Sequence, residues 1–139
     1  MSHHTGGCRC GAIRFEAAGE PVHISYCHCG DCRRASGAPL SAFVGFGAAD
    51  VTFHGEKGAA YGEAPFERRF CATCGSPISY ADARLEGRIF LMLGAMDRPE
   101  DYVPRVHGYT REQLPYLHID DGLPRRETTT VPRPEGENR

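Results

Sequence analysis

Apolar and polar residues alternate in several short stretches of this chain. The clearest examples are Ile13 with Phe15, Val22 with Ile24 and Tyr26, and Val51 with Phe53. Apolar side chains at every second position lie on one face of a strand, so the pattern predicts half-buried β-strands. Four longer stretches are further strand candidates: Leu40 to Phe46, Phe66 to Phe70, Pro77 to Tyr80 and Arg88 to Leu93.

The pattern gives little indication of helices. No stretch of a dozen residues carries apolar side chains at the 3.6-residue helical spacing, and 17 glycines and 10 prolines interrupt the chain at turn positions. One helical turn is expected around Pro99, with Asp97 as its N-cap. No helix is expected to follow Cys32. The sequence therefore predicts a mostly β fold.

The length of 139 residues suits one domain with a core of its own. No linker and no domain-sized repeat divides the residues before Pro124. The segment that follows is polar, contains proline and has no apolar pattern, so it is not expected to offset the entropy of ordering it. We assign residues 1–124 to one domain and residues 125–139 to a polar tail that is flexible or swaps as a strand.

The charge and the N-terminus narrow the location and the partners. A net charge of -2 argues against a nucleic-acid partner, because such binders need a basic excess. The first residues lack the apolar run of a secretory signal or a membrane span. We therefore expect a cytoplasmic protein without a membrane partner, and its oligomeric state is left open. In that reducing compartment cysteines serve as metal ligands or reactive thiols.

The seven cysteines form three groups along the chain: Cys8 with Cys10, then Cys27, Cys29 and Cys32, then Cys71 with Cys74. Zinc takes four protein ligands in a structural site, and three plus an exchangeable water in a catalytic one. Seven thiolates therefore divide into a closed site, made by the first and last groups, and an open site made by the middle group. A ribbon-like site from the two C-x-x-C pairs is the other partition, but the pairs lie much further apart than the roughly 15–20 residues usual for ribbons.

Two alternatives concern the middle group. A C-x-x-C pair can be a redox dithiol, although the low-pKa thiol of such pairs usually lies at a helix N-terminus. The second site could also be structural and closed by an imidazole or a carboxylate, which zinc accepts readily. The candidates to close it are His28, Asp31, His54, His107 and His118.

Four segments together resemble the glutathione-dependent formaldehyde-activating family, which includes centromere-protein-V-like zinc proteins: GGCRCGAIRFE, YCHCGDCRRASGAP, RRFCATCGSPISY and DDGLP. The resemblance covers about residues 6 to 124, with the cysteine motifs in the family's order. It implies a β-tent fold of antiparallel sheets and two zinc ions per chain. The structural zinc ligands would be Cys8, Cys10, Cys71 and Cys74, and the catalytic zinc ligands Cys27, Cys29 and Cys32.

The resemblance also implies an activity. The family's namesake reaction joins glutathione to formaldehyde as S-(hydroxymethyl)glutathione, and its reverse is carbon-sulfur lyase activity. A zinc ion with one open position would bind a small thiol, possibly glutathione, as its thiolate. Arg33 and Arg34 are candidates to bind a substrate carboxylate, with Arg68 and Arg69 as second candidates. Ser36 could hydrogen-bond the ligand or a zinc thiolate.

The C-terminal part of the matched region departs from the family's pattern. The chain has no tryptophan and carries Tyr116 in about the place of one, and the sequence RRE follows Pro124. These departures fall where the substrate pocket is expected. Two other classes also stay open at this point: a non-enzymatic zinc-stabilised protein-interaction module, and a zinc-stabilised redox enzyme, which would need a cysteine that binds no metal.

Overall fold

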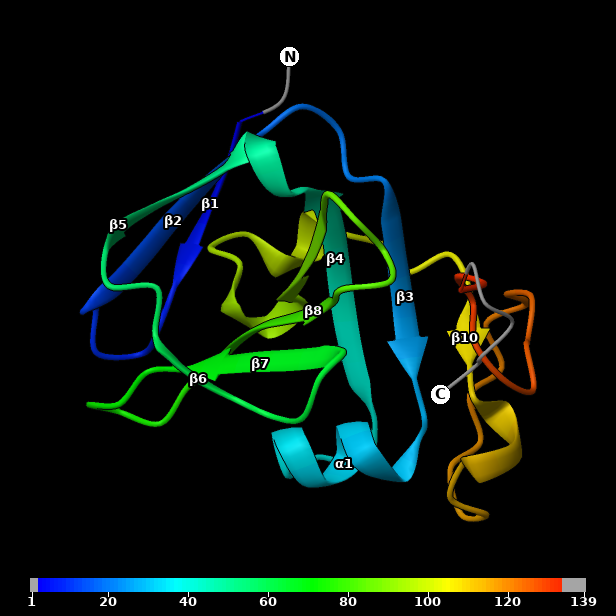
Figure 1. Cartoon of the computed structure of the whole chain (residues 1–139). Coiled ribbons are helices and arrows are strands. Elements are labelled where there is room, and N and C mark those ends of the chain that lie inside the picture. The colour runs from blue at the N-terminus through cyan, green and yellow to red at the C-terminus, as the bar shows by residue number, and fades with distance from the viewer. Residues whose placement is uncertain (1–2, 134–139) are drawn as a thin grey trace.

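The computed structural model describes residues 3–133, which form ten strands, one short α-helix and four 3-10 turns (Figure 1). The strands are β1 (His3–Gly7), β2 (Ile13–Ala18), β3 (His23–Cys27), β4 (Ser41–Gly47), β5 (Val51–Gly55), β6 (Ala59–Tyr61), β7 (Phe66–Phe70), β8 (Pro77–Asp82), β9 (Arg88–Met92) and β10 (His107–Gly108). The helix is α1 (Gly30–Ser36), and the 3-10 turns are η1 (Ala48–Asp50), η2 (Leu93–Ala95), η3 (Pro99–Asp101) and η4 (Thr110–Glu112). Among the described residues, no helix is long and apolar enough to cross a bilayer.

The strands form two sheets. The smaller sheet has the order β1-β2-β5, and the larger one has the order β10-β3-β4-β9-β8-β7-β6. Neighbouring strands are antiparallel, except that β10 runs parallel to β3. Figure 1 shows the smaller sheet beside the larger one, with α1 connecting the end of β3 to the start of β4. The expected mostly β class with antiparallel sheets is therefore confirmed.

Both faces of the larger sheet are covered. Successive side chains on a strand point to opposite faces. On β4 and β9, Val44 and Leu91 join the main core, which also contains Ile13 and Phe15 of the smaller sheet. The residues next to them on these strands, Phe43 and Phe90, point to the opposite face. They belong to a second cluster, which also contains Cys29 and Cys32 at the start of α1. One sheet thus packs against the smaller sheet on one face and lines the cysteine site on the other.

A close contact holds the smaller sheet against the rest of the protein. Gly6 of β1 forms a bridge with Met96, in the loop after η2. A Cβ atom at Gly6 would lie 2.5 Å from the carbonyl oxygen of Ala95 and 2.5 Å from the ring of Phe15. Only glycine therefore fits at this crossing.

The predicted strands agree with the structure. Each of the seven predicted stretches coincides with a strand; in chain order these strands are β2, β3, β4, β5, β7, β8 and β9. Three strands were not predicted, namely β1, β6 and β10. These strands are short or lack large apolar residues. Their conformation is determined by hydrogen bonding to the neighbouring strand.

The expectation that no helix follows Cys32 was wrong. Helix α1 starts after Cys29, whose sulfur accepts a hydrogen bond from the backbone N–H of Cys32 at 3.3 Å. It ends at Gly37, whose left-handed φ of 74° lets its N–H donate to the carbonyl of Arg33. The helix has seven residues and buries only Cys32. It is too short to show an apolar stripe in the sequence.

The helical turn at Pro99 is confirmed as η3, but Asp97 is not its N-cap. Arg98 occupies the cap position, and its side chain makes no capping hydrogen bond. The carboxylate of Asp97 instead accepts from Thr5 Oγ1 at 2.7 Å and from the guanidinium of Arg14. The Asp97 carboxylate is thus engaged in a tertiary ion pair with Arg14 and does not cap the turn.

The described part of the polar tail lies alongside β10 and the residues just after it, and backbone hydrogen bonds hold it there. The N–H of Tyr109 donates to Thr128, the N–H of Thr110 donates to Arg126, and Arg126 donates back to His107. We call residues 125–133 the C-terminal segment. The division into a domain at 1–124 and a flexible tail stays a prediction, and residues 134–139 lie outside the described part of the chain.

Candidate metal centres and substrate cavity

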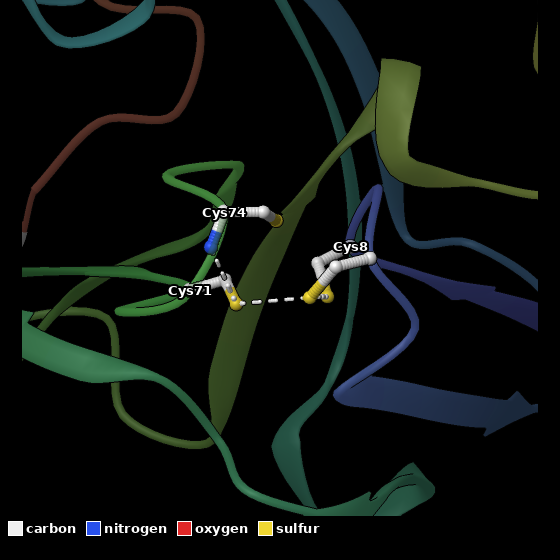
Figure 2. Close-up of side chains that lie close together, drawn as sticks. Cys8, Cys71 and Cys74 are labelled. Atoms are coloured by element: carbon white, nitrogen blue, oxygen red, sulfur yellow. Dashed lines mark hydrogen bonds between the residues drawn. The ribbon is translucent and has the colours of Figure 1, made fainter.

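Two tight loops bring together the first cysteine cluster. Cys8 and Cys10 lie in the turn after β1, not on an extended segment, and Cys71 and Cys74 lie in the turn between β7 and β8. Gly75 takes a left-handed φ of 83°, and its N–H donates to the carbonyl of Cys71, as expected for a glycine that closes this turn. Figure 2 shows Cys71 and Cys74 facing Cys8 across the gap between the two loops.

Hydrogen bonds stabilise the thiolate form at some of these cysteines. The backbone N–H of Ile13 donates to Cys8 Sγ at 3.2 Å, and that of Cys74 donates to Cys71 Sγ at 3.4 Å. The hydroxyl of Ser76 lies 3.1 Å from Cys74 Sγ, and its hydrogen bond lowers the pKa of Cys74 to about 5. Hydrogen bonds to the charged form stabilise it. Cys10 differs: the backbone N–H of Ala12 lowers its pKa, but the neighbouring Cys8 and burial outweigh this and raise it to about 11.

The second cluster forms where β3 meets α1. Cys27 ends β3, Cys29 caps the helix and Cys32 lies in its first turn. The pKa of Cys27 is raised, first by its interactions with Cys29 and Cys32 and then by burial. Three thiolates this close repel one another unless a cation lies between them.

The spacing of the sulfur atoms fits zinc. Zinc-sulfur bonds of about 2.3 Å in tetrahedral geometry place two sulfur atoms about 3.8 Å apart. Cys10 Sγ lies 3.6 Å from Cys8 Sγ and 3.8 Å from Cys71 Sγ. Within each cluster all sulfur atoms lie within 4.8 Å of one another. The two clusters are those of the four-and-three partition, and the two C-x-x-C pairs do not share a site.

Histidine and carboxylate side chains do not close the second cluster. Among the described residues, only the three cysteines place ligand atoms in this group. His28 and Asp31 are the nearest candidates in sequence, but His28 Nε2 bonds to His107 and Asp31 pairs with Arg68. His54 lies 2.8 Å from Glu16 on the smaller sheet. Among the described residues, this cluster therefore offers three ligand atoms, all of them cysteine sulfur.

A cavity of about 210 Å³ lies beside this second cluster. Aromatic rings form most of its apolar wall: Tyr26, Phe43, Phe66, Tyr80, Phe90 and Tyr109. The three cysteines lie at one side, and Thr129, Thr130, Val131 and Arg133 of the C-terminal segment lie at another. The thiols therefore face a partly closed, largely apolar space.

Arg133 fixes the C-terminal segment to the larger sheet. Its Nε donates to Asp82 Oδ2 at 3.0 Å, and its Nη1 donates to the carbonyl of Val131 at 2.6 Å. Asp82 is fully buried and also accepts from Arg84 at 2.9 Å. This charged group holds one wall of the cavity in place.

Three predicted substrate contacts lie away from the cavity. The guanidinium of Arg33 donates to the carbonyls of His28 and Glu112. Arg34 is exposed on α1, and Ser36 Oγ donates to the carbonyl of Cys32 at 2.9 Å. Tyr116, the residue in the family's tryptophan position, is 69% exposed and does not line the cavity. The guanidinium beside the thiols belongs to Arg68, which the sequence suggested only as a second candidate.

A hydrogen-bonded row of three side chains, two buried histidines and the exposed Asp121, was not predicted. His28 Nε2 lies 2.9 Å from His107 Nδ1, and His107 Nε2 lies 2.8 Å from Asp121 Oδ2. Both rings are fully buried, and burial followed by the neighbouring His107 lowers the pKa of His28 to about 4. The row connects DDGLP to the loop between Cys27 and Cys29. The two histidines are 79 residues apart, so their contact left no local pattern in the sequence. The sequence showed only that the Cys27–Cys29 segment and DDGLP both occur in the chain.

The fold and these clusters define a mostly β protein with two candidate metal centres. A model of the family described as "Glutathione-dependent formaldehyde-activating enzyme" matches residues 3–112. The chain therefore belongs to this family.

Two known proteins are similar to this chain. A Schizosaccharomyces pombe protein named as an uncharacterized lyase is 34% identical over 82 residues, which cover 58% of this chain and 59% of that protein. The match thus spans less than two thirds of the relative. The crystal structure of a Rhodobacter sphaeroides protein has a TM-score of 0.55 at 18% identity, covering 88% of this chain and 98% of its own. At that identity the likeness shows the fold alone.

Proposed function

We propose that this protein is a zinc-dependent carbon-sulfur lyase or synthase that acts on a small thiol or thiol adduct, as S-(hydroxymethyl)glutathione synthase does. One observation carries the proposal. Cys27, Cys29 and Cys32 converge beside a cavity, and among residues 3–133 no fourth ligand atom joins them. The family and the name of the Schizosaccharomyces pombe relative support a lyase.

In this proposal the two clusters have different roles. Cys8, Cys10, Cys71 and Cys74 hold a structural zinc, because four thiolates complete its coordination. Cys27, Cys29 and Cys32 hold the catalytic zinc, which would bind the substrate thiol and keep it deprotonated near neutral pH. All seven cysteines then bind metal, which leaves none for a redox mechanism.

The reaction forms and breaks one carbon-sulfur bond. In the forward direction the thiolate sulfur adds to the carbonyl carbon of an aldehyde such as formaldehyde, and the carbonyl oxygen takes up a proton. In reverse the hydroxyl proton leaves, the carbonyl reforms and the sulfur keeps the electron pair of the broken bond. Arg68 lies 3.6 Å from Cys32 Sγ and compensates negative charge there. The aromatic wall limits access of water to the adduct.

We further propose a cytoplasmic location, with glutathione as the first thiol to test. The absence of a candidate membrane helix among the described residues and the clustering of thiols are compatible with a reducing compartment.

Metal content and sulfur coordination test the proposal. Zinc per chain is measured on protein purified without chelators, and zinc X-ray absorption is recorded with and without glutathione. Two zinc ions, one of which gains a sulfur ligand from glutathione, are the expected result. Turnover of glutathione with formaldehyde must also exceed the uncatalysed addition.

Two other results would contradict the lyase proposal. One zinc per chain would remove the catalytic centre. Two zinc ions whose coordination no thiol changes would favour a zinc-stabilised protein-interaction module.

A further inference from the structure

We infer that this site selects short mercapto carboxylic acids and their S-hydroxymethyl adducts, and that Arg68 binds the carboxylate. The inference rests on the proposed function, because it takes the three-cysteine cluster as the position of the substrate sulfur. It goes further by naming the class of thiol and the residue that recognises it.

Arg68 is held rigidly beside the thiols. Its residue is 9% exposed, and its guanidinium lies over the ring of Tyr80, 4.8 Å from the centroid. Its Nη2 donates to Asp31 Oδ2 at 2.9 Å and lies 3.6 Å from Cys32 Sγ. Stacking and the ion pair fix the plane of the group, so little side-chain entropy is lost when a ligand binds.

Arg68 has hydrogen-bond donors to spare. A guanidinium carries five N–H donors, and in the described part of the chain only Nη2 of Arg68 makes hydrogen bonds to protein. Arg133, the other arginine at the cavity, uses Nε on Asp82, Nη1 on Thr129 and Val131, and Nη2 on Tyr80. Arg68 is therefore the cationic side chain at the cavity that can bind an added carboxylate.

The short distance between Arg68 and the cluster sets the length of the ligand. The spare donors, Nε and Nη1, belong to the same planar guanidinium whose Nη2 lies 3.6 Å from Cys32 Sγ, so a carboxylate bound to them lies close to the substrate sulfur. A mercapto acid with one or two carbons between sulfur and carboxylate meets this condition. In glutathione, by contrast, a peptide bond separates the cysteine sulfur from the nearest carboxylate.

The volume of the cavity favours the same ligands. It is about 210 Å³, whereas sites for drug-sized ligands measure roughly 300–1,000 Å³. A short mercapto acid fits inside it, with its methylene groups against Phe43 and Phe90. A tripeptide would place only its thiol end there and leave both of its charged ends outside.

The neighbouring arginine provides a matched control. Arg69 follows Arg68 on β7, so its side chain points to the other face of the sheet. It donates to Glu67 at 3.2 Å and to the carbonyl of Gly58 at 2.9 Å, and it does not line the cavity. Arg69→Gln removes the same charge without touching the cavity.

The test compares two thiols of nearly equal size by isothermal titration into the zinc-loaded protein. Mercaptoacetate carries a carboxylate, and 2-mercaptoacetamide carries an uncharged amide in its place. We expect the carboxylate to bind at least about tenfold more tightly, the effect of one charge-assisted hydrogen-bonded pair. Arg68→Gln should bring the ratio of the two affinities close to one, and Arg69→Gln should leave it unchanged.

The outcomes distinguish failure of the carboxylate inference from failure of the proposed lyase function. Equal binding of both thiols to the wild type would overturn the carboxylate inference and leave the proposed function standing. Binding of neither thiol would overturn the inference, and it would overturn the proposed function as well only if glutathione also fails to bind. An unchanged ratio in Arg68→Gln would remove the role of Arg68. If that variant does not fold, Arg68→Lys serves instead: it keeps the charge but loses the planar fork, so an unchanged ratio there would also count against the inference.

Discussion

Replacing Asp82 by asparagine should destabilise the protein strongly. The carboxylate is fully buried on β8 and accepts hydrogen bonds from the backbone N–H of Arg84 at 2.9 Å, from its guanidinium at 2.9 and 3.1 Å, and from Arg133 Nε at 3.0 Å. The variant keeps the shape of the side chain and removes its charge. Two guanidinium groups, only 12% and 11% exposed, then lose their counterion.

The size of the loss follows from that burial. Removing one partner of a buried ion pair costs about 3–5 kcal/mol. Because both guanidinium groups keep some contact with water, we expect about 3 kcal/mol of unfolding free energy to be lost. At roughly 2–4 °C per kcal/mol for a chain of this size, the melting temperature should fall by about 6–12 °C.

The effect should depend on pH. Burial alone would raise the pKa of Asp82, but the hydrogen bonds from Arg84, and then those from Arg133, outweigh it and hold the pKa below its usual value. A lowered pKa in the folded state means that the carboxylate contributes stability above its unfolded pKa of about 3.9 and loses it as pH falls through the folded pKa. The difference between wild type and Asp82→Asn should therefore be full at pH 6 and shrink below about pH 4.

Urea denaturation measures both effects, at pH 6 on the zinc-loaded proteins and at pH 6 and pH 3.5 on the zinc-free proteins, because protonated thiols release zinc at pH 3.5. Asp101→Asn is the control, because Asp101 also pairs with an arginine, Arg98, but the two side chains are 52% and 70% exposed. Exposed pairs contribute about 0.2–1 kcal/mol. A loss in Asp82→Asn no larger than in Asp101→Asn would refute the reasoning.

Three further predictions concern other parts of the fold. Asp121→Ala should cost about 1–3 kcal/mol in urea denaturation, because it leaves the buried His107 Nε2 without its acceptor; a cost matching that of the neighbouring Asp120→Ala would contradict this. Gly6→Ala should cost about 1–3 kcal/mol by the same assay, since the new methyl group would lie 2.5 Å from Phe15; wild-type stability would show that the sheets can separate freely. Cys29→Ala should bind one zinc per chain by atomic emission, and loss of both metals would argue against the four-and-three partition.

Much of the sheet structure could be predicted because each strand shows its own pattern. Strand β2 alternates buried Ile13 and Phe15 with more exposed residues, so a period of two is visible. Strand β1 has the sequence HHTGG and owes its conformation to pairing with β2. Strand β10 has two residues and exists only beside β3. Where pairing decides the conformation, the local sequence carries no signal.

The cysteine clusters could be predicted for a different reason. A metal site needs a set number of ligands, so counting thiols grouped them as the structure does. The cavity could not be predicted in this way. Arg33 and Arg34 follow Cys32 directly, but the helix turns both away from the cavity, while Arg68 reaches the thiols from a strand 36 residues further along. Proximity in sequence was a poor guide to proximity in space.

The four-cysteine cluster also constrains how the chain can be made. Cys10 and Cys71 are 61 residues apart, so a metal joining them closes a loop whose entropy is worth about 4 kcal/mol to the folded protein, by analogy with a disulfide. During translation at about 5–20 residues per second, Cys10 waits roughly 3–12 s for its partner to emerge.

In that interval Cys27, Cys29 and Cys32 are already available, so the nascent chain offers five thiols from which a zinc ion can take the wrong four. Final assembly then requires an exchange of ligands once Cys71 and Cys74 appear. Under the proposed function, the order in which the thiols leave the ribosome thus makes zinc supply a part of the folding pathway.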